Sequence, residues 1–337
     1  MTAPQDPGAL APPGRDLAAE AGPVRRSVAG RLPLYFHTVR HLRAGQIASQ
    51  LRRRLVPPRP PAAPPAVELR PAARHAAFLP GPEPAPVPGQ ISFVGQGRPF
   101  AVRHPDWVAR DAPKLWRYNL HYFDYLAWPG LDAAAKAALI DDWIARVPVG
   151  AEDAWEPYPV SLRVVNWLKY FLSLPPGGVP RTWQDSLAHQ VAALEGDVEY
   201  HLLANHLLKN GKALVFAGAC LSGPAATRWL ALGLDILGSE AEAQVLPDGG
   251  HVERSPMYHC IVLEDYLDVV NLLARNPGFV PAEKVALLAA AARRATDFLR
   301  GIRTGAGDIP LFNDAAFGIT RSAGDLLAYA DTVFVGA

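Results

Sequence analysis

The residues of this chain that could support chemistry are most concentrated between Asp248 and His259. This stretch, DGGHVERSPMYH, holds two histidines, a glutamate, an arginine and a tyrosine behind a Gly-Gly pair. Burying so many polar groups is costly unless they are solvated or bonded to one another. The glycines permit the torsions of a tight turn, and Ser255 and Pro256 fit the N-cap and first turn of a helix. The stretch predicts either a polar loop that caps a helix or one edge of a cleft.

A second polar group occurs in the predicted helix Tyr200–Leu221, at Asn205 and His206. The asparagine amide offers two N–H donors, and the imidazole offers one or two according to its protonation. His201 lies four residues before Asn205 and therefore on the same helical face. From the residues alone, a structural role is favoured for His206.

Composition limits the classes of function. The 337 residues carry a net charge of +1, which gives no long-range attraction to nucleic acid. Two cysteines make no disulfide framework, no metal-ligand spacing occurs, and we expect no cofactor and no metal. No apolar run has the length of a transmembrane helix, and the N-terminus lacks the apolar core of a secretory signal, so we expect a cytoplasmic protein off the membrane. The oligomeric state is left open.

Helix-spaced apolar residues dominate the chain from Pro105 onward and predict an all-α fold. Proline and glycine separate the segments, as in an array of helical hairpins. We expect helices at Leu131–Val147, Ser161–Ser173, Trp183–Leu194, Tyr200–Leu221, Ala225–Leu246, Met257–Arg275 and Pro281–Arg303.

The part before Pro105 has a different pattern. Residues 1–30, rich in Ala, Pro and Gly, are expected to be a disordered extension. Residues 31–55 predict a basic amphipathic helix, which either packs on the domain or lies on a membrane surface. The proline-rich stretch 56–89 is expected to lack regular structure, and Ile91–Val102 predicts a small hairpin. The segments 31–104, 105–320 and 321–337 are thus an N-terminal region, a helical domain and a truncated tail.

Five stretches of the chain resemble the heparinase II/III and alginate lyase family of polysaccharide lyases. They are LPDGGHVERSPMYHCIVLEDYLDVVNLL, LWRYNLHYFDYL, EPYPVSLRVVNWLKY, NHLLKNGKAL and YFHTVRHLRAGQIASQLRRRL. The resemblance covers roughly residues 31 to 320 and includes the order of the motifs. It implies an incomplete (α/α) toroid and the cleavage, by β-elimination, of an acidic glycan that contains uronate.

The resemblance also implies roles for individual residues. Asn205 and His206 match the pair that binds the substrate carboxylate, and Tyr258 matches the general acid. Sugar rings stack on aromatic faces, and arginine pairs with carboxylate or sulfate. The further residues expected to bind substrate are Arg163, Asn166, Trp167, His201, His251, Glu253, Arg254 and His259.

The family pattern adds a C-terminal β-sandwich that contributes a catalytic histidine or tyrosine. Here the chain ends at Ala337 with no histidine after His259, so we expect the sandwich to be absent and activity to be weak. The alternative is an accessory carbohydrate-binding protein in polysaccharide biosynthesis. A third option, a hydrolase, needs two opposed carboxylates, for which Glu253, Glu156 and Asp248 are available.

Overall fold

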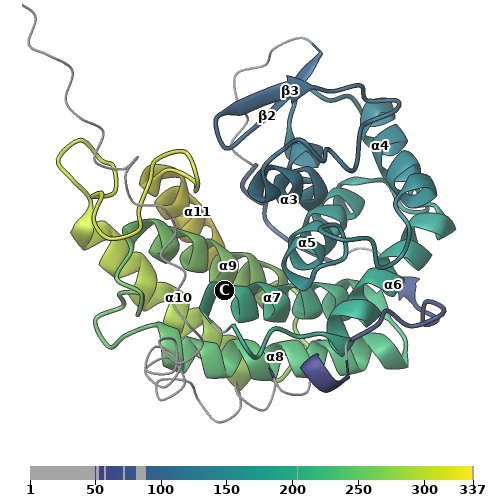
Figure 1. The fold of residues 1–337 in the computed structure, drawn as a ribbon. Helices are drawn as coiled ribbons and strands as arrows, with labels where there is room; N and C mark the ends of the chain where they lie inside the picture. The colour runs from purple at the N-terminus through teal and green to yellow at the C-terminus, as the bar shows by residue number, and fades with distance from the viewer. Residues whose placement is uncertain are drawn as a thin grey trace, which may run out of the picture. The chain divides into compact units, whose positions relative to one another are not determined.

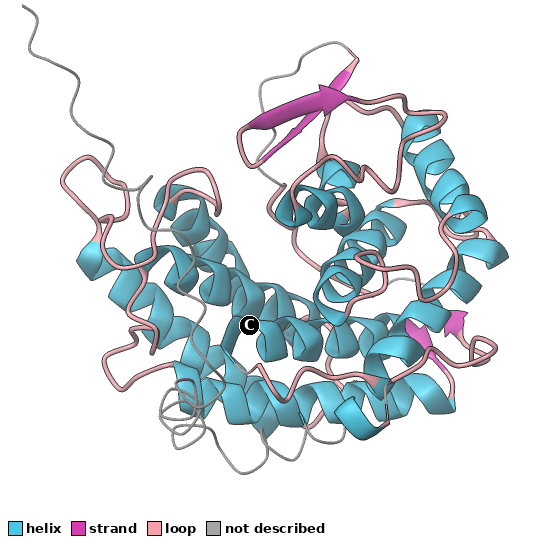
Figure 2. Cartoon of the chain, viewed as in Figure 1, coloured by secondary structure: helices cyan, strands magenta, loops and turns pink. Residues whose placement is uncertain are grey.

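The computed structural model describes residues 50, 53–56, 58–70, 73–80, 89–202 and 204–335, all within one compact unit, Ser49–Ala337. This unit is mainly helical, which confirms the predicted all-α class (Figures 1 and 2). The helices are α3 (Lys114–Tyr122), α4 (Ala133–Arg146), α5 (Pro157–Ser173), α6 (Arg181–Gly196), α7 (Ala204–Cys220), α8 (Pro224–Gln244), α9 (Pro256–Ala274), α10 (Ala282–Ile302) and α11 (Ala323–Val335), with a 3-10 turn at Asp124–Ala127. Each of the seven segments predicted from apolar spacing contains a helix. The predicted Tyr200–Leu221 helix begins only at Ala204, so His201 lies in the preceding turn and not on the helical face of Asn205.

The β-structure of the described residues consists of two short antiparallel ladders. Strands β2 (Gln90–Phe93) and β3 (Gln96–Pro99) pair in register Gln90 to Pro99, which confirms the predicted hairpin. Strand β1 (Glu68–Leu69) pairs with β4 (Leu221–Ser222), so the expectation that 56–89 lacks regular structure is wrong at these two residues. The predicted extension 1–30, and the helix 31–55 apart from residues 50 and 53–55, lie outside the described residues.

Helix α9 begins as its sequence predicts. Ser255 is the N-cap, its hydroxyl accepting from the backbone N–H of Tyr258 at 3.3 Å, and Pro256 occupies the first turn. The cap satisfies one of the N–H groups that the first turn leaves without a partner. It fixes the start of α9 and therefore the place of Tyr258.

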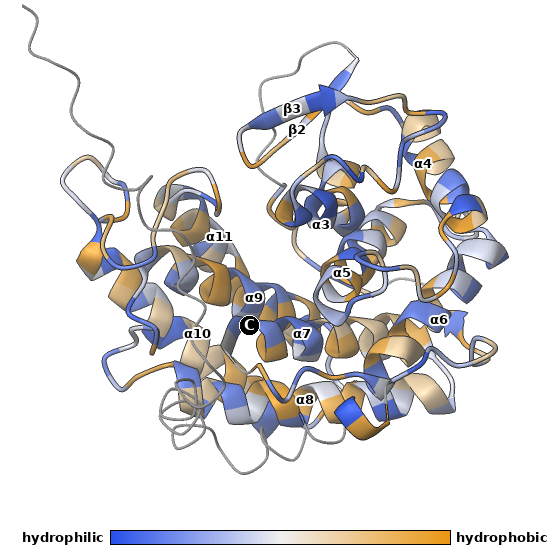
Figure 3. Ribbon diagram, viewed as in Figure 1, coloured by the Kyte–Doolittle hydropathy of each residue, from blue (hydrophilic) through white to orange (hydrophobic). Residues whose placement is uncertain are grey.

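Apolar side chains of the helices make one continuous core. Figure 3 shows hydrophobic residues along every helix of the domain. Helix α7 packs against α5, α8 and α9. Its approach to α8 is close at Gly233, where an added Cβ would lie 2.7 Å from the carbonyl oxygen of Gly211. Because the small side chain allows this contact, α7 is held deep in the core.

Helices α5, α7 and α9 run parallel to one another. Tyr158 near the start of α5 contacts His206 near the start of α7, and further along Lys169 of α5 and Lys212 of α7 both bind Asp268 of α9. One turn earlier on α7 and α9, Lys209 binds Asp265. Two successive contacts in the same order along each helix require the same direction. The N-terminal turns of the three helices therefore lie at one end of the core.

The segment after Arg303 also contains structure that the sequence patterns did not predict. Helix α11 packs on α9 and α10, with Leu326, Tyr329 and Val333 buried. Residues 323–335 are thus part of the helical domain, where we had expected a truncated tail.

Among the residues that the structure describes, no helix is both long enough and apolar enough to cross a bilayer.

Candidate active site

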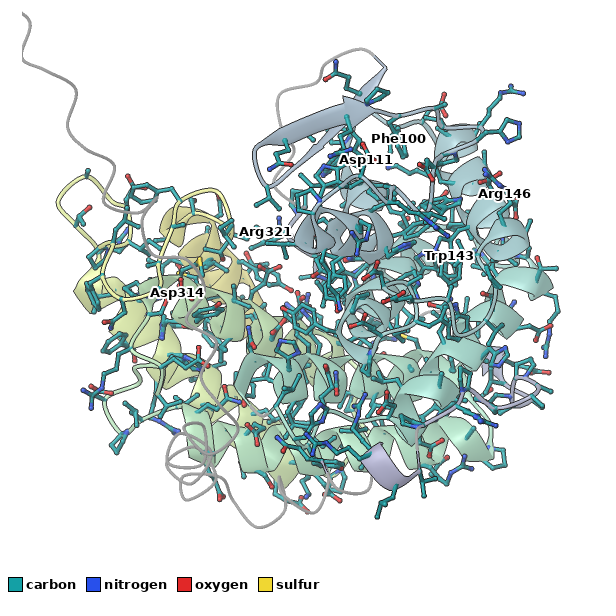
Figure 4. All side chains as sticks on the ribbon, viewed as in Figure 1. Phe100, Asp111, Trp143, Arg146, Asp314 and Arg321 are labelled. Atoms are coloured by element: carbon teal, nitrogen blue, oxygen red, sulfur yellow. The ribbon has the colours of Figure 1, made fainter. Side chains whose placement is uncertain are left out.

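A pocket of about 350 Å³ lies where the start of α7, the start of α9 and the loop between α10 and α11 meet. Its lining residues are Asn205, Glu253, Ser255, Tyr258, Asn313 and Asp314. Figure 4 shows Asp314 on that loop, on the same part of the molecule as Arg321. The volume lies at the lower end of the roughly 300–1,000 Å³ typical of small-molecule sites.

Two loops are joined by hydrogen bonds at the floor of this pocket. The Asn313 amide donates to the carbonyl of Arg254 at 2.6 Å, and the Ser255 hydroxyl donates to the carbonyl of Asp314 at 2.6 Å. Arg254 and Asn313 both adopt positive φ, at 55° and 54°. Such torsions are uncommon outside glycine and persist when surrounding contacts impose them.

The preceding turn depends on Gly249. Its φ is +89°, and an added Cβ would lie 2.1 Å from the carbonyl oxygen of Arg294 on α10. Only glycine fits this combination of torsion and contact. Gly249 and Gly250 thus allow the loop to pack directly on α10, a few residues before Glu253 reaches the pocket.

The Tyr258 hydroxyl donates to the Asp314 carboxylate at 3.3 Å. Burial raises the pKa of Tyr258 above its ordinary value of 10, and the negative charges of Asp314 and Glu253 raise it further. Burial also raises the pKa of Glu253, with Asp314 adding to the effect and His206 opposing it. Tyr258 is therefore a phenol that keeps its proton at neutral pH, beside two acidic groups.

Asn205 and His206 lie side by side at the start of α7. The half-buried Asn205 amide lines the pocket and makes no hydrogen bond to another described residue. The His206 ring lies 4.3 Å from the Tyr158 ring, and its Nδ1 is 3.1 Å from Oε1 of Glu199. The side chain of His206 is 35% exposed and that of Glu199 is 7% exposed, so the imidazole faces outward from a buried carboxylate.

Three tyrosines extend from His206 towards α3. The centroids of Tyr158 and Tyr122 are 6.0 Å apart, and those of Tyr122 and Tyr118 are 6.4 Å apart. The Lys114 ammonium lies 5.0 Å from the centre of the Tyr118 ring. Tyr122 is buried between the other two, whereas Tyr118 and Tyr158 are half-buried and can offer part of their rings to a sugar.

Two residues expected to bind substrate on α5 belong to the core. Arg163 and Trp167 are fully buried, and the Arg163 guanidinium lies 4.2 Å from the Trp143 ring and donates to Gln190 at 2.7 Å. The prediction that Arg163 binds substrate is therefore wrong, because this arginine joins α5 to α4 and α6. Trp167 packs edge-on against Trp143 and cannot stack on a sugar.

The two histidines of the Asp248–His259 stretch are also buried. His251 bonds the Gln244 side chain at 2.8 Å, and His259 bonds the carbonyl of Ala295 at 2.9 Å. Burial lowers the pKa of each to about 4. Both are therefore neutral at physiological pH and hold the loop and α9 in place. The prediction that they bind substrate is wrong, because both side chains are buried.

The other three residues have mixed positions. Asn166 is half-buried and donates to the carbonyl of Tyr122 at 2.9 Å and to Asp124, so its amide supports the 3-10 turn. His201 is half-buried in the loop before α7, and burial lowers its pKa. Arg254 is exposed next to the pocket, while its carbonyl is engaged by Asn313.

The described residues contain no group of three or more His, Cys, Asp or Glu side chains that could hold a metal ion. Cys220 and Cys260 are buried free thiols on separate helices. The side chains that line the pocket carry amide, hydroxyl, phenol and carboxyl groups, and the His206 imidazole follows Asn205 in sequence.

The fold and the pocket define a helical-hairpin domain with amide, phenol and carboxyl groups gathered at the N-terminal ends of α7 and α9. Residues 133–330, more than half of the chain, match the family described as Heparinase II/III N-terminus. The chain belongs to this family.

Two curated proteins share part of its sequence. The heparin-sulfate lyase of Bacteroides stercoris is 31% identical over 126 residues, which cover 36% of this chain and 19% of that lyase. The heparin-sulfate lyase of Bacteroides thetaiotaomicron is 29% identical over 130 residues, covering 36% and 18%. The matched stretch thus spans about a fifth of each relative.

Among solved structures, the heparan sulfate lyase HepC of Pedobacter heparinus has a TM-score of 0.46 and 21% identity, covering 67% of this chain and 38% of that chain. A heparinase III structure has a TM-score of 0.47 and 18% identity, covering 70% and 40%.

Proposed function

We propose that this chain is the helical part of a polysaccharide lyase that cleaves an acidic glycan containing uronate by β-elimination. The observation that carries the proposal is the presence of Asn205 and Tyr258 in one pocket, brought there by the parallel starts of α7 and α9. Elimination needs a donor for the uronate carboxylate and a proton source for the leaving oxygen around the same sugar.

Each group has a defined part in this reaction. The unengaged amide of Asn205 donates to the uronate carboxylate, which accumulates negative charge as the proton on the adjacent carbon is removed. A donor aimed at developing charge can contribute about 3–4 kcal/mol to the transition state. Tyr258 gives its proton to the glycosidic oxygen as that bond breaks, and its raised pKa keeps the proton available. The new chain end carries a carbon–carbon double bond.

The charge of the pocket favours a particular kind of acidic glycan. Glu253 and Asp314 line it, and none of the described residues that line it is a lysine or an arginine. Two carboxylates repel any anionic group, and the pocket offers the Asn205 amide to one such group, the uronate carboxylate, but no cationic side chain to a sulfate beside it. The named relatives are heparin-sulfate lyases, and for this chain we propose a substrate with little sulfate on the sugar next to the cleaved bond.

The test measures near-ultraviolet absorbance of the unsaturated product with heparan-type, chondroitin-type and alginate-type polymers of graded sulfation. Tyr258→Phe removes the proton donor and keeps the ring, so turnover is expected to fall about 10²–10⁴-fold. Tyr170→Phe is the matched control. Tyr170 of α5 is also half-buried, but it packs beside Trp183 of α6 and does not line the pocket. Equal activity in Tyr258→Phe and Tyr170→Phe would remove Tyr258 from the mechanism.

A second candidate function is glycan binding without cleavage, as an accessory protein in polysaccharide assembly. The half-buried rings of Tyr118 and Tyr158 favour it, because partly exposed aromatic rings can hold a sugar without proton transfer. Calorimetric binding of the same oligosaccharides with no unsaturated product would support this function over the lyase.

A further inference from the structure

A buried chain of hydrogen bonds ends on His206. The Asn210 amide donates to Oε2 of Glu199 at 3.0 Å and to the Ser161 hydroxyl at 3.0 Å, while its oxygen accepts from the Glu199 backbone N–H at 2.8 Å. The Ser161 hydroxyl donates in turn to the carbonyl of Pro157 at 2.8 Å. The chain joins α5, α7 and the loop that precedes α7.

These groups are as buried as apolar core residues. Asn210 is 0% exposed, Ser161 is 1% exposed and Glu199 is 5% exposed. Burying a carboxyl group is costly unless specific partners satisfy it. Here one oxygen is satisfied by Asn210, and the other is directed at Nδ1 of His206, 3.1 Å away. The network therefore holds the Glu199 carboxylate against the Nδ1 edge of the half-exposed His206 imidazole.

The chemistry of this contact determines which nitrogen carries the proton. A carboxylate only accepts hydrogen bonds, so a neutral His206 must carry its proton on Nδ1 to bond Glu199. Its Nε2 then holds a lone pair. In this tautomer Nε2 cannot donate to a substrate carboxylate, which is the role implied by the family resemblance, but it can accept a proton.

We propose that Glu199 is a positioning residue that fixes the Nδ1–H tautomer of His206 and thereby makes Nε2 the base that removes the uronate proton. This inference rests on the proposed lyase function. With Tyr258 as the acid and His206 as the base, both proton-transfer groups of the reaction come from the helical domain. The charged and titratable groups around the imidazole are Glu199 and His201 before α7, Tyr158 on α5, and Glu253 before α9.

The elimination balances with these residues. Nε2 of His206 takes the proton from the carbon next to the carboxylate, and that electron pair forms the double bond as the glycosidic C–O bond breaks. The leaving oxygen takes the Tyr258 proton. The imidazolium then loses its added proton to water and the phenolate regains one, so the net result is a proton moved from carbon to oxygen.

The tautomer can be measured without any substrate. Protein carrying ¹⁵N-labelled histidine has ten imidazoles, and the His206 signals are assigned by their loss in His206→Asn. In the full chain near neutral pH, the account predicts that Nδ1 of His206 is the protonated nitrogen and Nε2 the unprotonated one. Glu199→Gln removes the acceptor-only partner and should yield mixed tautomers, while Glu199→Asp, which keeps a carboxylate, should retain part of the preference.

Glu195→Gln is the matched control. Glu195 is also a hydrogen-bonded glutamate, at the end of α6, where it accepts from Trp229 at 3.0 Å and pairs with Arg228. This variant should leave the His206 tautomer unchanged. Thermal unfolding of Glu199→Gln and Glu195→Gln shows whether Glu199→Gln is folded. If it is not, the tautomer of His206 in the wild type and in Glu199→Asp still tests the proposal.

Activity supplies the second measurement. Glu199→Gln should lower kcat about 10²–10⁴-fold with little change in KM, because a histidine held in the wrong tautomer still leaves the binding groups in place. Glu199→Asp should restore part of kcat. A wild-type protein with the proton on Nε2, or an unchanged tautomer in Glu199→Gln, would overturn the proposal. If no polymer is cleaved, the lyase function fails, whereas the ¹⁵N spectra still report whether Glu199 controls His206.

Discussion

The carboxylate of Asp268 holds four helices together, and its replacement should cost more stability than any surface charge. Asp268, on α9, is 0% exposed. One oxygen accepts from Lys169 of α5 at 2.6 Å and from Lys212 of α7 at 2.5 Å, and the other accepts from the Tyr329 hydroxyl of α11 at 2.8 Å. Asp268→Asn keeps the shape but removes the charge partner of Lys169 and leaves Lys212 paired with Asp265 alone.

The magnitude follows from burial. Removing one partner of a buried ion pair typically costs about 3–5 kcal/mol, because an uncompensated charge stays in the core. For a domain of this size, each kcal/mol lowers Tm by roughly 2–4 °C, so Asp268→Asn should unfold about 6–20 °C lower. Asp235→Asn is the control, since its pair with Lys284 at 3.3 Å is on the surface and Asp235 is 74% exposed. Its effect should be within about 0.5 kcal/mol.

The same pair gives a pH dependence with a definite sign. Burial alone would raise the pKa of Asp268, but the ammonium groups of Lys169 and Lys212 overcome this and lower it well below its usual range. A carboxyl with a depressed pKa in the folded state contributes stability above its unfolded pKa of about 3.9 and loses it as the pH falls further.

The gap between wild type and Asp268→Asn in urea unfolding should therefore be widest near neutral pH and should narrow below about pH 4. A loss no larger than that of Asp235→Asn, or a gap that is constant into acid, would refute the reasoning.

Two further predictions concern the pocket. Asn205→Ala removes the donor to the uronate carboxylate and should lower kcat about 10²–10³-fold in steady-state assays. The control Asn119→Ala removes an amide that bonds to its own helix and should leave kcat unchanged. Equal kcat values in the two variants would exclude the role of Asn205. Asp314→Asn removes a charge that raises the pKa of Tyr258, so the phenol should ionise at lower pH in a spectrophotometric titration referenced to Tyr258→Phe, and an unchanged titration would show that Asp314 does not act on this hydroxyl.

The sequence predicted the elements well because their signals are local. Apolar spacing and the prolines and glycines between segments define the helices, and Ser255 followed by Pro256 defines the start of α9. Helix α11 is the exception, because the family pattern, and not local apolar spacing, led to the prediction of a truncated tail for residues 321–337.

The site was less predictable because burial depends on contacts distant in sequence. An arginine in a helix rich in aromatic residues suggests a ligand contact, yet Arg163 faces the ring of Trp143 from another helix. His259 looks like a pocket residue, but the turn of α9 directs it to α10. Glu199 carries no sequence signal, since its importance comes from its distance to His206 and from Asn210 behind it.

The mass of the cleavage products tests the central claim most directly. Elimination divides a defined uronate oligosaccharide into two fragments whose masses sum to that of the parent, and the account predicts this result for the wild-type chain, with loss of both fragments in Tyr258→Phe. Fragments whose masses sum to the parent plus one water would contradict it, because they would identify a hydrolase acting through carboxyl groups such as Glu253 and Asp314.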